Sequence, residues 1–323
     1  MKAYILGEGG PEVREVPTPQ AAAGEVQVRV RASGLNRVDI LMSRGRKHGA
    51  AGGPGAVLGL EWAGEVSALG EGVTTFKVGD RVMGSGGGAW AEFTCVDAGR
   101  VAPIPDGMSF EQGSTLAVAL QTMHDAVVTH GQLKPGGSIL IQGASTGVGL
   151  MGLQIAKALG AGLVIGSSTN PQRRARLAEF GADLAIDSRD PSWVDQVLQA
   201  TGGKGVDAIV DQLSGYVAND NMRATKVTGR IVNVGRLGGE SGPFEFDLHA
   251  MRRIEYIGVT FRTRSKAEVA QIVSRWRADL WQGVASGKLS LPIDSTFGFD
   301  DLAQALEHMR KNNHFGKIVL TID

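Results

Sequence analysis

The sequence contains very little cysteine: Cys95 is the only one among 323 residues. A single thiol excludes an intrachain disulfide, and it excludes a zinc site of the four-cysteine or Cys₂His₂ kind. The neighbours of this thiol, Phe93, Thr94 and Val96, are typical of a strand. We therefore expect Cys95 to be a buried, unreactive side chain.

The chain also lacks an excess of charge of either sign. Lys plus Arg number 33, Asp plus Glu number 33, and no block of like charge occurs. This balance argues against nucleic acid or a membrane surface as the main partner. No apolar run reaches the roughly 18 residues of a membrane helix, and the start shows no signal-peptide pattern. We expect a cytoplasmic protein.

The pattern of strands and helices changes once along the chain. Residues 1–117 are mainly short strands punctuated by glycine, which favours a partly closed β-barrel. From Ser138 onwards, strands alternate with helices, which is typical of a doubly wound parallel sheet. The tail does not continue that alternation, and its simplest place is back in the first domain. Two domains also agree with a length at which single cores stop growing.

A small-residue turn begins the second domain. The apolar run 139–141 predicts a buried strand, residues 143–147 a turn, and residues from Val148 a helix that ends at Gly160. Small residues allow the backbone to approach a pyrophosphate, and a helix N-terminus offers it free N–H groups. The alternative is a tight loop without ligand, because 47 residues of this chain are glycine.

The end of the next strand indicates which dinucleotide binds. An NAD site places a carboxylate about twenty residues beyond the glycines, to bind the ribose 2′-hydroxyl. Here the strand ends in Ser167 and Ser168 without a carboxylate, and Arg173 and Arg174 follow. Hydroxyl and guanidinium groups can bind a 2′-phosphate, so the sequence predicts NADP(H). The alternative is that both arginines are solvated helix residues.

Four segments together resemble a known family: Gly143–Gly149, Val78–Val82, Ser33–Asp39 and Gly316–Leu320. The whole chain is similar to the medium-chain dehydrogenase/reductase superfamily, and within it to the zinc-independent quinone oxidoreductases that include zeta-crystallin. This resemblance implies an α/β plus β fold. A GroES-like, partly closed β-barrel would form from residues 1–120 and 262–323, with a Rossmann domain inserted at 121–261. It also implies a homodimer through the sheet edge at Ile254–Phe261.

The resemblance further implies roles for individual residues. The pyrophosphate would contact the glycine turn, the 2′-phosphate the end of the second Rossmann strand, and the nicotinamide residues of both domains. The expected cofactor-binding residues are Asn36, Thr122, Ala144, Ser145, Thr146, Gly147, Val148, Ser167, Ser168, Arg173, Leu213, Val234, Gly235, Arg236, Phe261, Arg262 and Thr263. Asn36 and Thr122 are also the expected catalytic residues, because they would hold the nicotinamide or the substrate carbonyl.

The chain departs from its zinc-dependent relatives at the metal ligands. Asn36 stands where they have a cysteine, and Gly59-Leu60-Glu61 replaces their Gly-His-Glu segment. We therefore expect no metal. Three other positions differ from the quinone oxidoreductase pattern: Thr146 replaces a glycine of the turn, Ser188 replaces a Tyr or His beside the adenosine phosphate, and Leu41 replaces an active-site Tyr.

These features predict an NADPH-dependent reductase of quinones or α,β-unsaturated carbonyls. A conjugated acceptor spreads the developing charge, so a few hydrogen-bond donors can replace a metal. Asn36 is the expected donor, although it could instead be a turn-forming residue, and Asp39 either orients it or is structural. The proton donor stays open between water, His48 and Lys47. Two alternatives remain: a redox-silent NADPH-binding protein, and an enoyl thioester reductase that uses Arg44, Arg46 and Lys47 for carrier phosphates.

Overall fold

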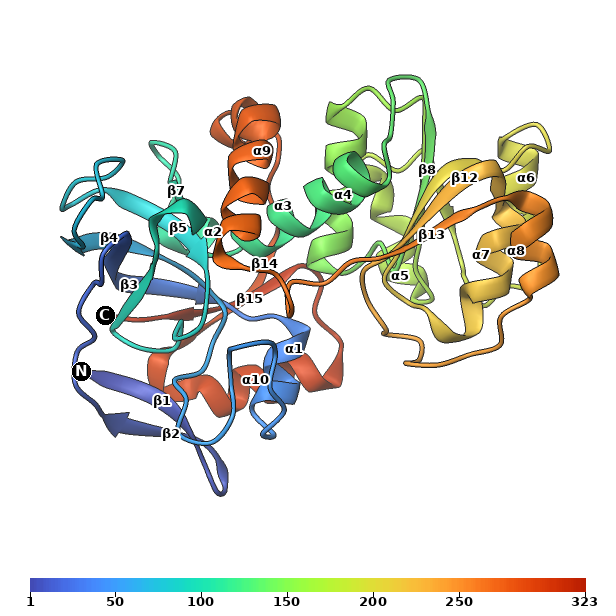
Figure 1. The fold of residues 1–323 in the computed structure, drawn as a ribbon. Coiled ribbons are helices and arrows are strands. Elements are labelled where there is room, and N and C mark those ends of the chain that lie inside the picture. Colours follow the sequence, from blue (N-terminus) through green and yellow to red (C-terminus); the bar gives the residue numbers. More distant parts are fainter. The chain divides into compact units, whose positions relative to one another are not determined.

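The computed structural model describes residues 1–323, which divide into two compact units. Unit 1 comprises Met1–Val118 and Phe261–Asp323, and unit 2 comprises Ala119–Thr260. Figure 1 shows the strands of both ends of the chain, blue and red, together in unit 1. No helix is both long enough and apolar enough to cross a membrane.

A seven-stranded mixed sheet forms the centre of unit 1, in the order β14-β15-β3-β4-β5-β7, with β6 also paired to β3. A separate hairpin joins β1 and β2. The bounds are β1 Lys2–Gly7, β2 Gly10–Glu15, β3 Glu25–Gly34, β4 Glu61–Leu69, β5 Arg81–Ser85, β6 Phe93–Asp97, β7 Val101–Pro103, β14 Ile293–Gly298 and β15 Lys317–Thr321. The last strand, β15, pairs antiparallel with β3 (Figure 1), which places the tail in this sheet.

Alternating apolar residues build the core of unit 1. Val26, Val28 and Val30 of β3 are fully buried, as the period-two pattern of that segment predicts. They pack with Trp62, Trp90 and residues from both ends of the chain. The helices of this unit are α1 Arg37–Met42, α2 Phe110–Gly113, α9 Lys266–Ala285 and α10 Leu302–Lys311, with 3₁₀ turns η1 Ala98–Arg100 and η5 Phe299–Asp301.

Unit 2 is a doubly wound sheet. Six parallel strands lie in the order β10-β9-β8-β11-β12-β13, with bounds β8 Ser138–Gln142, β9 Leu163–Ser167, β10 Leu184–Ile186, β11 Val206–Asp211, β12 Thr225–Asn233 and β13 Glu255–Gly258. Its helices are α3 Ala117–His124, which starts in unit 1, the π-helix η2 Asp125–His130, α4 Gly147–Ala158, α5 Pro171–Ala175, η3 Leu177–Phe180, α6 Trp193–Ala200, η4 Gly215–Val217, α7 Ala218–Ala224 and α8 Phe246–Arg252. The expected GroES-like and Rossmann folds are thus confirmed.

Some element boundaries differ from the local sequence pattern. The segment 56–60, whose apolar run predicts a strand, forms only an isolated bridge through Val57. The pattern of residues 219–226 predicts a helix, but α7 ends at Ala224, and Thr225 and Lys226 begin β12. In the tail, residues 289–293 are predicted to be extended, whereas β14 spans Ile293–Gly298. At Thr225, pairing with Val206 of β11 overrides the local helical pattern.

Three charged or amide side chains meet in the interior of unit 1. The ammonium of Lys317 on β15 donates to Glu61 Oε2 on β4 at 2.6 Å and to Asn36 Oδ1, before α1, at 3.0 Å. Glu61 is fully buried, and Lys317 is only 5% exposed. The second carboxylate oxygen of Glu61 accepts from the backbone N–H of Val118 at 2.7 Å. This cluster joins the end of the chain to two segments near its beginning.

Asp39 lies beside this cluster and is fully buried. Burial raises the pKa of Asp39 to about 7, while the Asn36 N–H bond and Lys317 act to lower it and Glu61 to raise it. One carboxylate oxygen accepts from the Asn36 N–H at 2.7 Å, and the other has no hydrogen-bond partner. The folded state therefore retains the proton of Asp39 to a higher pH than the unfolded chain does.

This difference makes the free energy of unfolding depend on pH. Because the folded pKa lies above the ordinary value of 3.8, the contribution of Asp39 is fully present below pH about 4 and is lost as pH rises to about 7. Relative to an Asp39→Asn variant, the wild type should lose about 4 kcal/mol over this range. Urea unfolding of both proteins at several pH values measures it. The exposed Asp106→Asn variant is the control. If the stability difference between the wild type and Asp39→Asn does not change with pH, the assignment is contradicted.

Candidate functional site

The turn between β8 and α4 is held in shape by the next strand. The N–H of Gly143 donates to Ser167 Oγ at 2.9 Å, and the N–H of Ala144 donates to the Ser167 carbonyl at 2.8 Å. A Cβ at Gly149 would lie 2.7 Å from Ala144 Cα, so only glycine allows this approach of helix to strand. Ser167 is fully buried, and its hydroxyl donates to Gln142 Oε1. Ser167 therefore supports the turn from inside.

Thr146 begins α4 as its N-cap. Its hydroxyl oxygen accepts from the N–H of Gly149 at 2.9 Å and lies 3.0 Å from Gln212 Oε1. Thus the threonine that replaces a glycine of the turn uses its hydroxyl for capping and for a link to the end of β11. Gln212 completes the link, because its amide donates to the carbonyl of Gln142 at 3.1 Å.

The first turn of α4 offers an anion site. The N–H groups of Gly147 and Val148 have no acceptor in the chain, whereas the neighbouring turn N–H groups of Gly143 and Ala144 are bonded. Free N–H groups at the positive end of a twelve-residue helix favour a phosphate. Ser145, in the middle of the turn, has its hydroxyl 2.9 Å from that of Ser168. These residues fit the pyrophosphate of a dinucleotide.

The end of β9 supplies the residues expected at the ribose phosphate. Ser168 follows the strand and is buried, and Arg173 lies half-buried on α5. Arg174, the other candidate, is already engaged: it donates to the Ser168 carbonyl and to Asp187 Oδ2, both at 2.8 Å. Arg174 therefore links the end of β9 to Asp187. Ser145 and Ser168 lie together at the same end of the sheet.

The ends of β11 and β12 approach the same turn. Leu213 lies against Gly143, with its Cδ2 3.3 Å from the point where a Cβ would stand. Gly235 follows β12, and a Cβ there would lie 2.7 Å from the Gln212 carbonyl oxygen. Arg236 is exposed, and its guanidinium reaches the Val234 carbonyl at 3.2 Å. These expected cofactor residues all lie at the carboxyl ends of parallel strands, where open α/β sheets bind ligands.

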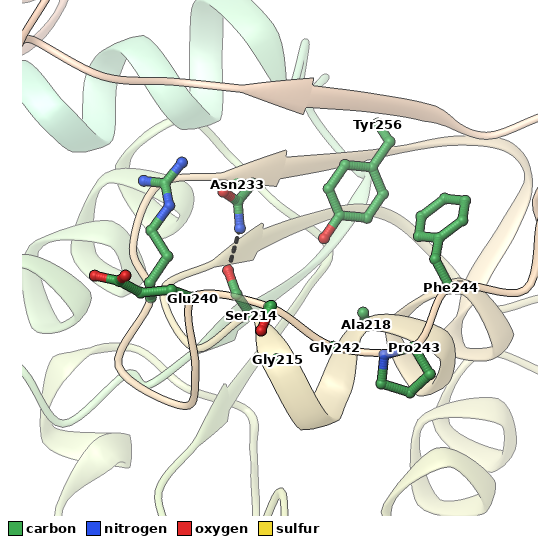
Figure 2. A pocket seen from close by; sticks show the side chains of 11 residues that line it. Ser214, Gly215, Ala218, Asn233, Glu240, Gly242, Pro243, Phe244 and Tyr256 are labelled. Atoms are coloured by element: carbon green, nitrogen blue, oxygen red, sulfur yellow. Dashed lines mark hydrogen bonds between the residues drawn. The ribbon is translucent and has the colours of Figure 1, made fainter.

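A cavity of ≈ 290 Å³ opens beside Arg236, between β12, β13 and the loop that precedes α8. Figure 2 shows Tyr256 and Phe244 near one end, and a hydrogen bond from Asn233 to Ser214 near the other. Burial and then the Asp211 carboxylate raise the pKa of Tyr256 to about 12, so its phenol is neutral. Ser214 has φ 57° and ψ −154°, a backbone region that normally requires glycine and that occurs at functional loops.

In unit 1, both the nitrogen and the oxygen of the Asn36 side-chain amide make hydrogen bonds. Its nitrogen donates to Glu61 Oε2 at 3.0 Å and to the Gly34 carbonyl at 3.2 Å, and its oxygen accepts from Lys317. The side chain is half-buried, and the neighbouring Leu41 is 39% exposed. The charged side chains of Glu61 and Lys317 thus fix the orientation of the Asn36 amide.

The other expected nicotinamide residues lie on three segments. Thr122 is a buried residue of α3 in unit 2, whereas Phe261, Arg262 and Thr263 form a turn at the start of the second part of unit 1. Burial, and then Arg262, lower the pKa of His48, so its ring is neutral at pH 7. A neutral imidazole is a poor acid, which disfavours His48 as the proton donor.

The sequence did not predict that Lys317 forms a buried ion pair with Glu61 and a hydrogen bond to Asn36. Lys317 belongs to a motif that carries the resemblance, but nothing in the local pattern shows that its ammonium is buried against Glu61. A signal does exist, since a lysine directly before the apolar residues 318–320 predicts a charged partner once the strand is buried.

The residues present do not fit a transition metal. No group of three or more His, Cys, Asp or Glu side chains is arranged to hold one. At the position of the family's zinc ligands, Asn36 and Glu61 already surround the Lys317 ammonium, and a metal ion would stand next to this cation.

Known proteins resemble the chain over its whole length. Residues 22–106 match the alcohol dehydrogenase GroES-like domain and residues 147–277 match the zinc-binding dehydrogenase domain. A crystal structure of an alcohol dehydrogenase superfamily protein from Novosphingobium aromaticivorans is 30% identical, with a TM-score of 0.88 and full coverage of both chains. A quinone oxidoreductase from Pseudomonas syringae is 28% identical, with a TM-score of 0.84 and full coverage of both chains.

An enoyl reductase and a polyketide synthase are also similar to the chain. The CurK enoyl reductase structure is 26% identical, with a TM-score of 0.86 over 100% of this chain and 99% of that one. A mycocerosic acid synthase-like polyketide synthase of Mycobacterium tuberculosis is 30% identical over 93% of this chain. The present chain spans only 14% of that much longer protein. The domain matches and the full-length likeness to the Novosphingobium protein show that this chain belongs to the medium-chain dehydrogenase/reductase superfamily.

Proposed function

We propose that the chain is an NADPH-dependent reductase that transfers hydride to a quinone or an α,β-unsaturated carbonyl without zinc. The observation that supports this most is the buried cluster of Lys317, Glu61 and Asn36, where a fixed ammonium occupies the region of the family's metal ligands. A simple ketone needs strong polarisation, which a metal supplies. A conjugated acceptor needs less, and oriented hydrogen-bond donors suffice.

In this proposal each part of the chain has a separate task. The N–H groups of Gly147 and Val148 bind the pyrophosphate, and Ser168 and Arg173 bind the 2′-phosphate. When bound, NADPH would supply the hydride. Lys317 polarises the Asn36 amide through Oδ1, which strengthens its N–H groups as donors. The longer of the two Asn36 N–H bonds, to Gly34 O at 3.2 Å, is the one we propose is exchanged for the substrate oxygen.

An enoyl thioester reductase is the second candidate function. The likeness to the CurK enoyl reductase and to polyketide synthases favours it. The hydride chemistry is the same, because an enoyl thioester is also a conjugated carbonyl. The two candidates differ in the substrate's tail, for which Arg44, Arg46 and Lys47 offer positive charge on one loop.

One assay decides between these functions. NADPH oxidation is followed with 9,10-phenanthrenequinone, a short enone and an enoyl thioester, each with a metal chelator present. Turnover of the quinone or the enone under chelation supports the first candidate, and preference for the thioester supports the second. Activity that chelation abolishes, or no turnover with any acceptor, refutes the proposal, and the latter favours a redox-silent NADPH-binding protein.

We also propose a homodimer through β13. This strand is the last of the parallel sheet, so its outer edge is unpaired, and exposed unpaired edges are templates for a second strand. Light scattering should then give about twice the chain mass of 33.9 kDa. A mass of one chain at micromolar concentration contradicts the dimer.

Loss of the Asn36 amide should slow the chemical step. An Asn36→Ala variant is expected to lower turnover roughly 100-fold, the usual effect of removing one donor to a developing oxyanion. Steady-state rates at saturating NADPH measure it. Asn313→Ala is the matched control, since it removes an exposed amide of the same unit. Unchanged turnover in Asn36→Ala refutes the donor role.

Loss of the Arg173 guanidinium should change cofactor preference. Arg173→Ala is expected to weaken NADPH binding about tenfold and NADH binding little, since a charge-assisted bond to phosphate contributes about 1.5–3 kcal/mol. Fluorescence titration with each cofactor measures both affinities. Arg176→Ala is the control, because Arg176 pairs with Glu179 at 3.0 Å. Equal weakening of both cofactors, or equal affinity of the wild type for them, contradicts the assignment.

A further inference from the structure

One hydrogen bond in unit 2 joins two loops that belong to strands far apart in the sheet. Ser188 follows β10 and is 4% exposed, and Tyr216 lies in η4, which follows β11. The Ser188 Oγ and the Tyr216 hydroxyl are 3.0 Å apart. Because β9 and β8 lie between β10 and β11, this bond spans the carboxyl ends of the strands that carry the dinucleotide turn.

The Tyr216 ring is held but not covered. A Cβ at Gly238 would lie 2.7 Å from the ring's Cε1, so the neighbouring loop supports one part of the ring through a glycine. The guanidinium of Arg189 lies 5.8 Å from the ring centroid. Nevertheless, 42% of Tyr216 is exposed, which is high for an aromatic residue with three such contacts. An open aromatic face and a cation thus stand together at the ligand-binding end of the sheet.

The charges around Arg189 leave it available for an anion. Asp187, two residues earlier, is paired with Arg174 at 2.8 Å. Asp190, the next residue, accepts hydrogen bonds from the backbone and hydroxyl of Ser192. Neither carboxylate pairs with the Arg189 guanidinium. A nucleotide matches this combination. Its base can stack on the tyrosine ring while its phosphate pairs with the guanidinium.

We propose that Tyr216, fixed by Ser188, determines binding of the adenosine half of the cofactor, with Arg189 pairing to the ribose phosphate. This inference rests on the proposed NADPH function. It also gives a role to Ser188, which replaces the Tyr or His of the quinone oxidoreductase pattern. The ring comes from a different loop, and Ser188 keeps it in position.

The test uses the full chain and two nucleotides that lack nicotinamide, 2′,5′-ADP and 5′-ADP, titrated by calorimetry. Tyr216→Ala should raise the Kd of both about tenfold, a typical effect of losing one stacked base. Arg189→Gln should raise the Kd of 2′,5′-ADP about tenfold and that of 5′-ADP little. Phe246→Ala, which removes a ring that is 77% exposed in the same unit, should change neither.

The hydrogen bond itself has a separate readout. Ser188→Ala and Tyr216→Phe, both conservative, should each weaken nucleotide binding two- to fivefold, roughly the effect of one hydrogen bond. The double variant should be no weaker than either single variant, because both remove the same bond. In turnover assays, the KM for NADPH should rise while kcat at saturation stays constant.

The outcomes separate this inference from the proposed function. If the wild type binds NADPH and 2′,5′-ADP but Tyr216→Ala binds them equally well, the role of Tyr216 is overturned and the NADPH function stands. Additive losses in the double variant overturn the Ser188 contact. If the wild type binds neither nucleotide nor NADPH, the proposed function fails, and this inference fails with it.

Discussion

The ion pair between Lys317 and Glu61 is the contact on which the rest of unit 1 depends. It buries two opposite charges that would be very costly to bury alone, and it fixes the orientation of the Asn36 amide as a consequence. Removing either charge alone would leave the other unpaired in the core. Such a pair adds little stability over a well-packed apolar pair, so its value lies in orientation. The chain thus carries its own positive charge at the position where its zinc-dependent relatives have their metal ligands.

Glycine and serine, rather than large side chains, determine the shape of the cofactor end of unit 2. Gly149 lets α4 approach Ala144, and Ser167 holds the turn from beneath. What remains exposed at the turn is backbone N–H, which binds phosphate without regard to the rest of the ligand. Selectivity must then come from side chains at the rim of the site, and those rim residues lie on separate loops.

The sequence predicted the fold well because each unit has a strong local pattern. The alternating β3 segment and the apolar 139–141 run formed strands as expected. Contacts between distant segments could not be predicted from the sequence, because the periodic spacing of apolar residues describes only local structure. The Lys317 ammonium lies 256 residues from Glu61 in sequence, and Tyr216 reaches Ser188 over 28. The structure gives the position of Asn36, Thr122 and the expected cofactor residues. Their roles stay predictions.

The pairing of β15 with β3 has a consequence for how this chain acquires its structure during synthesis. Unit 2 is one continuous stretch and can fold as soon as residue 260 is free of the ribosome. Unit 1 must wait, because β15 lies between β14 and β3 and pairs Val319 with Gly34. Until Lys317–Thr321 have been made, residues 32–34 of β3 lack their partner strand and Glu61 lacks its counter-ion. During synthesis, part of the β3 edge is therefore exposed while the parallel sheet of unit 2 can already be complete.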